Sequence, residues 1–145
     1  MKWFKFLINF ALFASAVLNI GSGISQITGL AYGEMADLVY RIFDGIQTLD
    51  IIVGIGLFAV AALAIYARIR LAGYRKNGPK ALNAVYLATA AVQLIYIIGI
   101  FIIAPNGIAE EIDFSTNITS IAISIGMVSA NTTYFKKRAH LFVND

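Results

Sequence analysis

The stretch RIRLAGYRKNGPK, residues 68–80, separates two long uncharged runs of the chain. It contains no acidic residue, and its five cations are Arg68, Arg70, Arg75, Lys76 and Lys80. The runs on either side of it, residues 51–67 and 81–104, contain no charged residue at all. Because short cytoplasmic loops of membrane proteins collect lysine and arginine, the pattern predicts a cytoplasmic connection between two transmembrane helices.

The composition of the whole chain predicts the same environment. Of its 145 residues, 59% are apolar and 13% are charged, whereas soluble domains carry about 25% charged residues. The mean hydropathy is +0.79. A domain of this size leaves a large share of its surface exposed, so a water-soluble fold could not hide so much apolar surface. The absence of Cys excludes disulfides and thiolate metal sites.

Four stretches are long and apolar enough to cross a bilayer, which takes about 20 residues of α-helix. We place these spans at about residues 6–29, 47–67, 80–104 and 115–135, with Ser115 and Thr116 capping the fourth. The predicted fold is therefore an all-α membrane protein, a single domain over residues 1–145 that forms a four-transmembrane-helix bundle. Lys2 and Lys5 followed by an apolar run resemble a signal peptide. The run continues to Ile27, however, so we expect a retained span.

The charges divide into two groups on opposite sides of these spans. Ten of the eleven cations lie before the first span, between the second and third, or after the fourth, and Arg41 is the exception. Seven of the eight acids lie on the opposite side, six of them in the other two connections and Asp50 where the second span begins. This predicts that both termini are cytoplasmic and that residues 68–80 contact lipid headgroups. Because the cations recur in every cytoplasmic segment, as topology requires, we expect no nucleic-acid partner.

Residues 34–45, between the first two spans, show a helical repeat of apolar residues. The residues on one face include Leu38, Ile42 and Phe43, and charged residues occupy the other face. The pattern predicts a short amphipathic helix in the outer membrane interface. Its apolar face is expected either to cap the bundle or to contact a membrane protein partner.

The predicted spans contain few polar residues. Asn19 and Gln93 fall at similar depths, about 18–20 Å from the cytoplasmic ends of their helices, and could hydrogen-bond to each other near Ser15, Thr89 and Ser124. Such contacts hold membrane helices together, and the alternative is a site for a small polar solute. Small residues at a spacing of four predict the helix faces that turn into the bundle, with a homodimer seam as the alternative. They include Gly23, Gly54, Ala122, Gly126 and Ala130.

No pattern typical of an enzyme occurs, so we expect no catalytic residue and no cofactor. Asp50 is the nearest ionisable group to a span core, and it lies where the second span begins, at the positive end of a helix. A charge-free interior argues against proton-coupled transport. The acids Glu110, Glu111 and Asp113 lack the spacing of a calcium loop, so no metal site is expected.

Four stretches resemble a group of small, uncharacterised four-span integral membrane proteins of Gram-positive anaerobic bacteria. They are MKWFKFLINFALFA, MADLVYRIFDGI, YRKNGPK and NTTYFKKRAHLFVN. The resemblance covers nearly the whole chain and implies a bacterial cytoplasmic membrane, but it implies no activity and no site residue.

Two functions are compatible with these observations. The first is a non-enzymatic scaffold or interaction component that contacts the lipid bilayer and either a membrane protein partner or a second copy of the chain. The alternative is a small channel or facilitator for a polar solute, lined by Asn19, Gln93 and Ser124.

Overall fold

The structure is a computed structural model that describes residues 2–103 and 113–145. Within these ranges the chain forms helices and no β-strand, which confirms the predicted all-α class. The first long segment consists of α1 (Lys2–Phe6), the π-helix η1 (Leu7–Ala11) and α2 (Leu12–Thr28). The short elements η2 (Leu30–Met35) and α3 (Ala36–Ile42) follow it. The remaining elements are α4 (Asp44–Ala72), α5 (Gly78–Ile103), α7 (Ser115–Lys136) and η3 (Ala139–Leu141).

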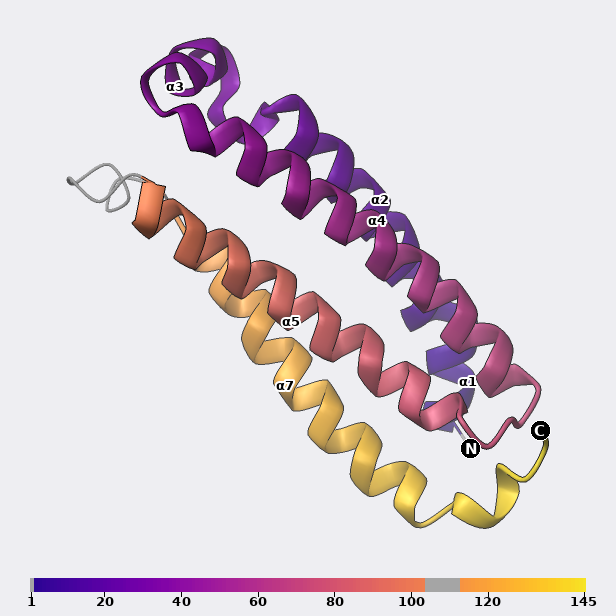
Figure 1. The fold of residues 1–145 in the computed structure, drawn as a ribbon. Coiled ribbons are helices and arrows are strands. Elements are labelled where there is room, and N and C mark those ends of the chain that lie inside the picture. The colour runs from indigo at the N-terminus through magenta and orange to yellow at the C-terminus, as the bar shows by residue number, and fades with distance from the viewer. Residues whose placement is uncertain (1, 104–112) are drawn as a thin grey trace.

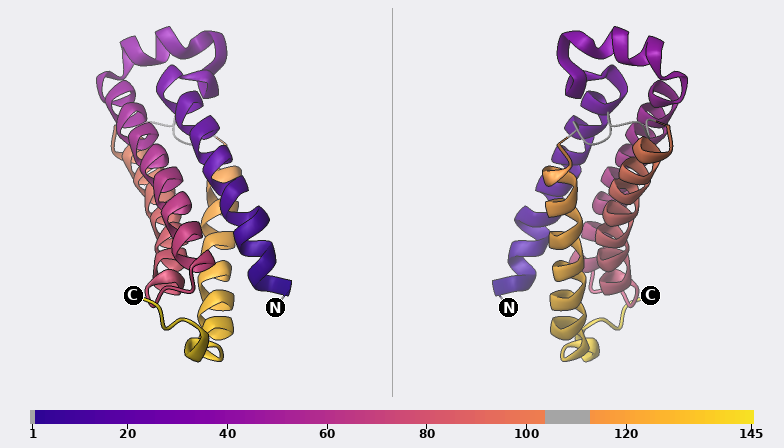
Figure 2. Two further views of the ribbon diagram at one scale, coloured as in Figure 1. Left: turned by 90° about the vertical axis from the view of Figure 1, so that its right-hand side faces the viewer. Right: turned by 90° about the vertical axis from the view of Figure 1, so that its left-hand side faces the viewer.

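The long helices run along a common axis, and α3 crosses one end of the assembly (Figures 1 and 2). We call this the α3 end. Both termini lie at the opposite end, which we call the tail end (Figure 1). Helix α2 packs on α4, α4 on α5, and α5 on α7. Because no comparable packing joins α2 to α7 in the described ranges, these two helices form the flanks of an open arrangement.

Three helical segments are long and apolar enough to cross a membrane: Lys2–Thr28, Gly45–Ala72 and Gly78–Ile103. Their outward faces are apolar, as expected for contact with lipid: Leu18 is 68% exposed and Ile102 is 73% exposed. Helix α7 has 22 residues but is rich in Ser, Thr and Asn. It is therefore less hydrophobic than the other three.

Glycines allow α2 and α4 to approach closely. A Cβ on Gly54 would lie 2.3 Å from Cγ1 of Ile27 and 3.0 Å from the carbonyl oxygen of Gly23. The predicted role of Gly23 and Gly54 in packing is confirmed. The ridge on α7 behaves differently, because Ala122, Gly126 and Ala130 are all exposed. The prediction that these three residues turn into the bundle is therefore wrong, since α7 turns Ser120 and Ser124 inward instead.

Four aromatic side chains hold the tail end together. The Phe142 ring is buried, with its centroid 5.2 Å from that of Phe135, 5.6 Å from Tyr74 and 5.9 Å from Phe4. These residues come from the tail, α7, the α4–α5 connection and α1. One apolar cluster therefore joins all the chain segments that meet at this end.

The region predicted as one amphipathic helix over residues 34–45 is divided. Phe43 has extended backbone angles, φ −120° and ψ 92°, so α3 and α4 meet at a corner. Leu38 and Ile42 are exposed, at 47% and 59%. Phe43 is instead half-buried against the cluster around Ile46 and Leu49. Because of the corner, the three residues predicted to share a partner face do not share one.

Helix α7 begins differently from the prediction. Its N-cap is Phe114, which makes no side-chain capping bond. The carboxylate of Asp113 accepts hydrogen bonds from the backbone N–H and the hydroxyl of Ser115, at 2.9 and 2.6 Å. These two bonds hold the pKa of Asp113 below its usual value. The predicted capping by Ser115 and Thr116 is therefore wrong, because the acceptor precedes them in the chain.

We predict that Gly54→Ala lowers the free energy of unfolding by about 1–2 kcal/mol. The added methyl group forces α2 away from α4, and overpacking of this kind costs about 1–3 kcal/mol, offset in part by the higher helix propensity of Ala. Thermal unfolding in detergent measures the effect. Gly126→Ala is the matched control, because a Cβ there meets nothing within 4 Å. An equal loss in both variants would contradict the proposed close approach.

Candidate functional site

A groove with a volume of about 1170 Å³ runs between α2 and α7. Val53 and Leu57 of α4 and Tyr86, Thr89 and Gln93 of α5 form its floor. Its walls are residues of α1, η1 and α2 on one side and of α7 on the other. Its lining contains no Asp, Glu, Lys, Arg or His.

The hydroxyls and amides of the lining lie in the half of the groove nearer the α3 end, beside apolar side chains such as Leu18 and Val53. Along α2, a stripe of hydroxyls and amides runs at helical spacing through Ser15, Asn19, Ser22 and Gln26. Helix α7 presents a second stripe, which consists of Thr116, Asn117, Ser120 and Ser124. The two stripes belong to the two helices that do not pack on each other. Their free hydrogen-bonding capacity is therefore directed into the groove.

The half nearer the tail end is apolar, with Phe6, Phe10, Ala11, Ala14 and Met127 in its lining. Beyond Met127, a hydrogen bond of 3.1 Å from Nε1 of Trp3 to Oδ1 of Asn131 links α1 to α7. Asn131 is fully buried. This contact joins the two flanks at the tail end. Nearer the α3 end, α2 and α7 do not pack on each other.

The five intramembrane residues predicted from the sequence all line this groove: Ser15, Asn19, Thr89, Gln93 and Ser124. The bonds of the two amides differ from the suggested Asn19–Gln93 pair. Asn19 donates to the carbonyl oxygen of Ser15 at 2.7 Å, within its own helix. Gln93 accepts a hydrogen bond from the amide of Asn117 on α7. Sequence reasoning missed Asn117, because its position in the predicted span gave no sign of which neighbour it faces.

The side chain of Asp50 is more buried within the protein than its sequence position suggested. It is fully buried within α4, although we expected it at the edge of a span. Gln26 donates to its Oδ1 at 2.6 Å, and the hydroxyl of Tyr40 donates to its Oδ2 at 2.8 Å. Asp50 nevertheless lies near the beginning of α4, at the end of the span where the sequence placed it. Gln26 also lines the groove, so only its side chain separates the buried carboxylate of Asp50 from the groove.

Tyr40 belongs to α3, outside the long helices. Burial of its hydroxyl, followed by its hydrogen bond to Asp50 and the nearby negative charge, raises the pKa of Tyr40 well above its usual value. The phenol therefore stays protonated over the physiological range and remains a donor to the carboxylate. In this way Tyr40 ties α3 to the beginning of α4.

Most of the cations predicted to meet lipid headgroups also make contacts within the chain. Nε of Arg68 donates to the carbonyl oxygen of Ile8 in η1 at 2.7 Å. A π-turn shifts carbonyls out of the regular helical ladder, so an outside donor at this point stabilises it. Nε of Arg70 donates to the hydroxyl of Tyr66 at 3.1 Å. Lys80 is exposed.

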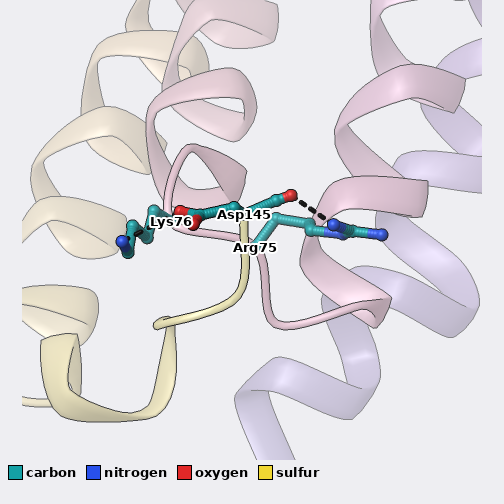
Figure 3. A network of polar contacts seen from close by, with 3 residues as sticks. All are labelled: Arg75, Lys76 and Asp145. Atoms are coloured by element: carbon teal, nitrogen blue, oxygen red, sulfur yellow. Dashed lines mark hydrogen bonds and ion pairs between the residues drawn. The ribbon is translucent and has the colours of Figure 1, made fainter.

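The two remaining cations bind the tail (Figure 3). Nζ of Lys76 lies 2.9 Å from Oδ1 of Asp145, and a guanidinium N–H of Arg75 donates to the Asp145 main-chain oxygen. The backbone adds to these contacts, because the N–H of Lys76 donates to the carbonyl of Asn144 at 2.8 Å. The ion pair is exposed and contributes little by itself. The buried ring of Phe142 accounts for most of the attachment.

The acidic loop gives no candidate site. Glu110 and Glu111 lie outside the described residues, and the Asp113 carboxylate is bonded to Ser115. In residues 2–103 and 113–145, no three His, Asp or Glu side chains come together as metal ligands.

Comparisons of the chain with protein-family models, with curated protein sequences and with solved structures give no match.

We predict that Tyr40→Phe lowers the free energy of unfolding by about 1–3 kcal/mol at neutral pH, because the buried carboxylate of Asp50 loses the hydrogen bond from Tyr40. Because the pKa of Tyr40 is raised in the folded state, the hydrogen bond contributes its full stability below about pH 10. This stability is lost as the pH rises through the folded-state pKa of Tyr40. The difference in the free energy of unfolding between wild type and variant should therefore become smaller in strong alkali. Unfolding in detergent across pH measures it, with Tyr66→Phe at the tail end as the control. A gap that widens above pH 10 would contradict the assignment.

Proposed function

We propose that the chain is an integral protein of the bacterial cytoplasmic membrane with four spans and both termini on the cytoplasmic side. The distribution of charge supports this arrangement, since the tail end carries the basic segments and the α3 end carries acids such as Glu34 and Asp37. The polar residues of α7 support it as the fourth span. Those in its first half, such as Asn117, Ser120 and Ser124, face the groove. Ile118 and Ile125 are exposed at 59% and 60% on its outer side.

Within that membrane the protein acts as a non-enzymatic interaction component, and the groove is its binding surface. The observation that carries this proposal is the pair of hydroxyl and amide stripes on α2 and α7, two helices that do not pack together. Hydrocarbon cannot hydrogen-bond to these groups, so an occupant that can is favoured over acyl chains. The exposed Leu38 and Ile42 of α3 extend the contact surface into the outer interface.

A small facilitator for a polar solute is the second candidate. Asn19, Gln93 and Ser124, the residues expected to line such a path, all line the one groove. The Trp3–Asn131 contact at the tail end favours a binding surface over a path through the membrane. Solute flux into liposomes that is abolished by Asn19→Leu and by Gln93→Leu would favour the facilitator.

Because the chain contains no Cys, single cysteines can map its topology without a modified background. We predict that Glu34→Cys is labelled by a membrane-impermeant maleimide in intact cells that produce the protein. Lys137→Cys should be labelled only after the cells are opened. Labelling of both cysteines in intact cells would place residue 137 on the outer side and contradict the four-span topology.

A groove that holds a specific occupant should capture it. We predict that a photoreactive benzophenone attached to Ser120→Cys, in the groove, forms an adduct of defined mass in membranes. Ser129→Cys is the matched control, because it is exposed on α7, is absent from the lining and lies nine residues further along the helix, on its opposite face. Identical adduct patterns at the two positions would mean that the groove meets only bulk lipid.

A further inference from the structure

We propose that the groove binds a membrane amphiphile with an uncharged, hydroxyl-rich head, such as a glycolipid. The inference rests on the proposed function and names the class of its occupant. Its basis is the division of the groove along its length into a hydrogen-bonding half and an apolar half. An amphiphile has the same division, with its head toward the α3 end and its chains toward the tail end.

The polar half has the chemistry that recognises hydroxyl groups. An amide side chain offers both donors and an acceptor, and a hydroxyl offers one donor and two lone pairs. Gln93 uses its oxygen to accept from Asn117, which leaves the amide N–H groups of Gln93 and the oxygen of Asn117 as further donors and acceptor. Ser120 and Ser22 add hydroxyls on the two walls. A head with several hydroxyls can use both kinds of group.

The charges of the groove argue against a phosphate head. Phosphate groups in proteins are commonly paired with Arg, Lys or a metal ion, and the lining has no cationic side chain. The nearest buried charge beside the groove is the carboxylate of Asp50, bonded to Gln26, and it would repel an anion. An unpaired phosphate placed there would lose solvation without compensation. Ten of the eleven cations of the protein lie in the segments at the tail end instead, next to the apolar half. The exception, Arg41, belongs to α3 and is not part of the lining.

The size and shape of the groove also favour a lipid-sized occupant. At about 1170 Å³ it exceeds the range of about 300–1,000 Å³ that is usual for small-molecule pockets. Phe10 and Met127 offer an apolar path for chains. Because α2 and α7 do not pack together, the groove is open along its side, and a lipid can enter from the bilayer without passing through water.

Lipid retention tests the inference. The protein is placed in phosphatidylcholine nanodiscs that contain equal fractions of a glucosyl diacylglycerol and a phosphatidylglycerol with identical chains. It is then re-extracted, and the bound lipids are counted by native mass spectrometry. The test variant is Gln93→Leu with Asn117→Leu. Removing both partners of one hydrogen bond leaves no orphaned group, so the fold is expected to persist, and the melting temperature verifies this.

We expect the double variant to retain about tenfold less glucolipid, a difference of about 1.4 kcal/mol in binding. Phosphatidylglycerol bound at the tail-end cations should be unchanged. Ser129→Leu, outside the groove, should alter neither. Glucolipid retention within twofold of wild type in the double variant would overturn the inference, and so would an equal loss of phosphatidylglycerol.

The photocrosslinking experiment separates the two levels of the proposal. If Ser120→Cys captures a protein or a second copy of the chain and the double variant keeps its glucolipid, the groove binds a partner and the lipid inference alone fails. If Ser120→Cys captures nothing beyond the Ser129→Cys control, the proposed function fails with it.

Discussion

A polar group in hydrocarbon has no water to bind, so each polar side chain of the long helices needs a partner in the protein or in the molecule beside it. The structure meets this constraint in two ways. The carboxylate of Asp50 is fully buried and accepts hydrogen bonds from Gln26 of α2 and Tyr40 of α3. The hydroxyls and amides of the groove are bonded in part and face an open space. The first arrangement stabilises the fold, and the second makes binding favourable.

The order of helix packing determines where the second arrangement occurs. Gly23 and Gly54 bring α2 against α4, and the side chain of Leu49 packs at Gly99, which brings α4 against α5. Each helix therefore packs on its neighbour in the chain, and the two outermost helices are left facing each other. At the tail end they are joined by the Trp3–Asn131 bond and the aromatic cluster. The groove is the space that these contacts leave between α2 and α7.

The sequence predicted the helices well because their cause is local. Charge-free runs of sufficient length predict spans. Helix α4 (Asp44–Ala72) extends the predicted 47–67 at both ends, and α5 (Gly78–Ile103) lies close to the predicted 80–104. The glycines of α2 and α4 were also identified, since small residues at a spacing of four have one main use in such helices. The corner at Phe43 was not predicted, because the apolar repeat continues through it to Ile46. The Asp44-Gly45 pair that follows Phe43 is the local turn signal that could have indicated it.

The sequence predicted which residues line the candidate site but not which residues they bond to. Polar residues in apolar runs are few, so the five expected residues were easily found, and they do lie in one groove. Their bonds depend on the rotation of each helix about its axis, which no local signal specifies. The pairing of Gln93 with Asn117 follows from α5 packing on α7, and the burial of Asp50 follows from Gln26 and Tyr40 closing over it. A rotation of α7 by half a turn would turn Ser120 and Ser124 away from the groove and Gly126 toward it. The hydrogen bond from Asn117 to Gln93 opposes that rotation near one end of α7, and the bond from Trp3 to Asn131 opposes it near the other. The groove therefore keeps its polar lining through more than one contact.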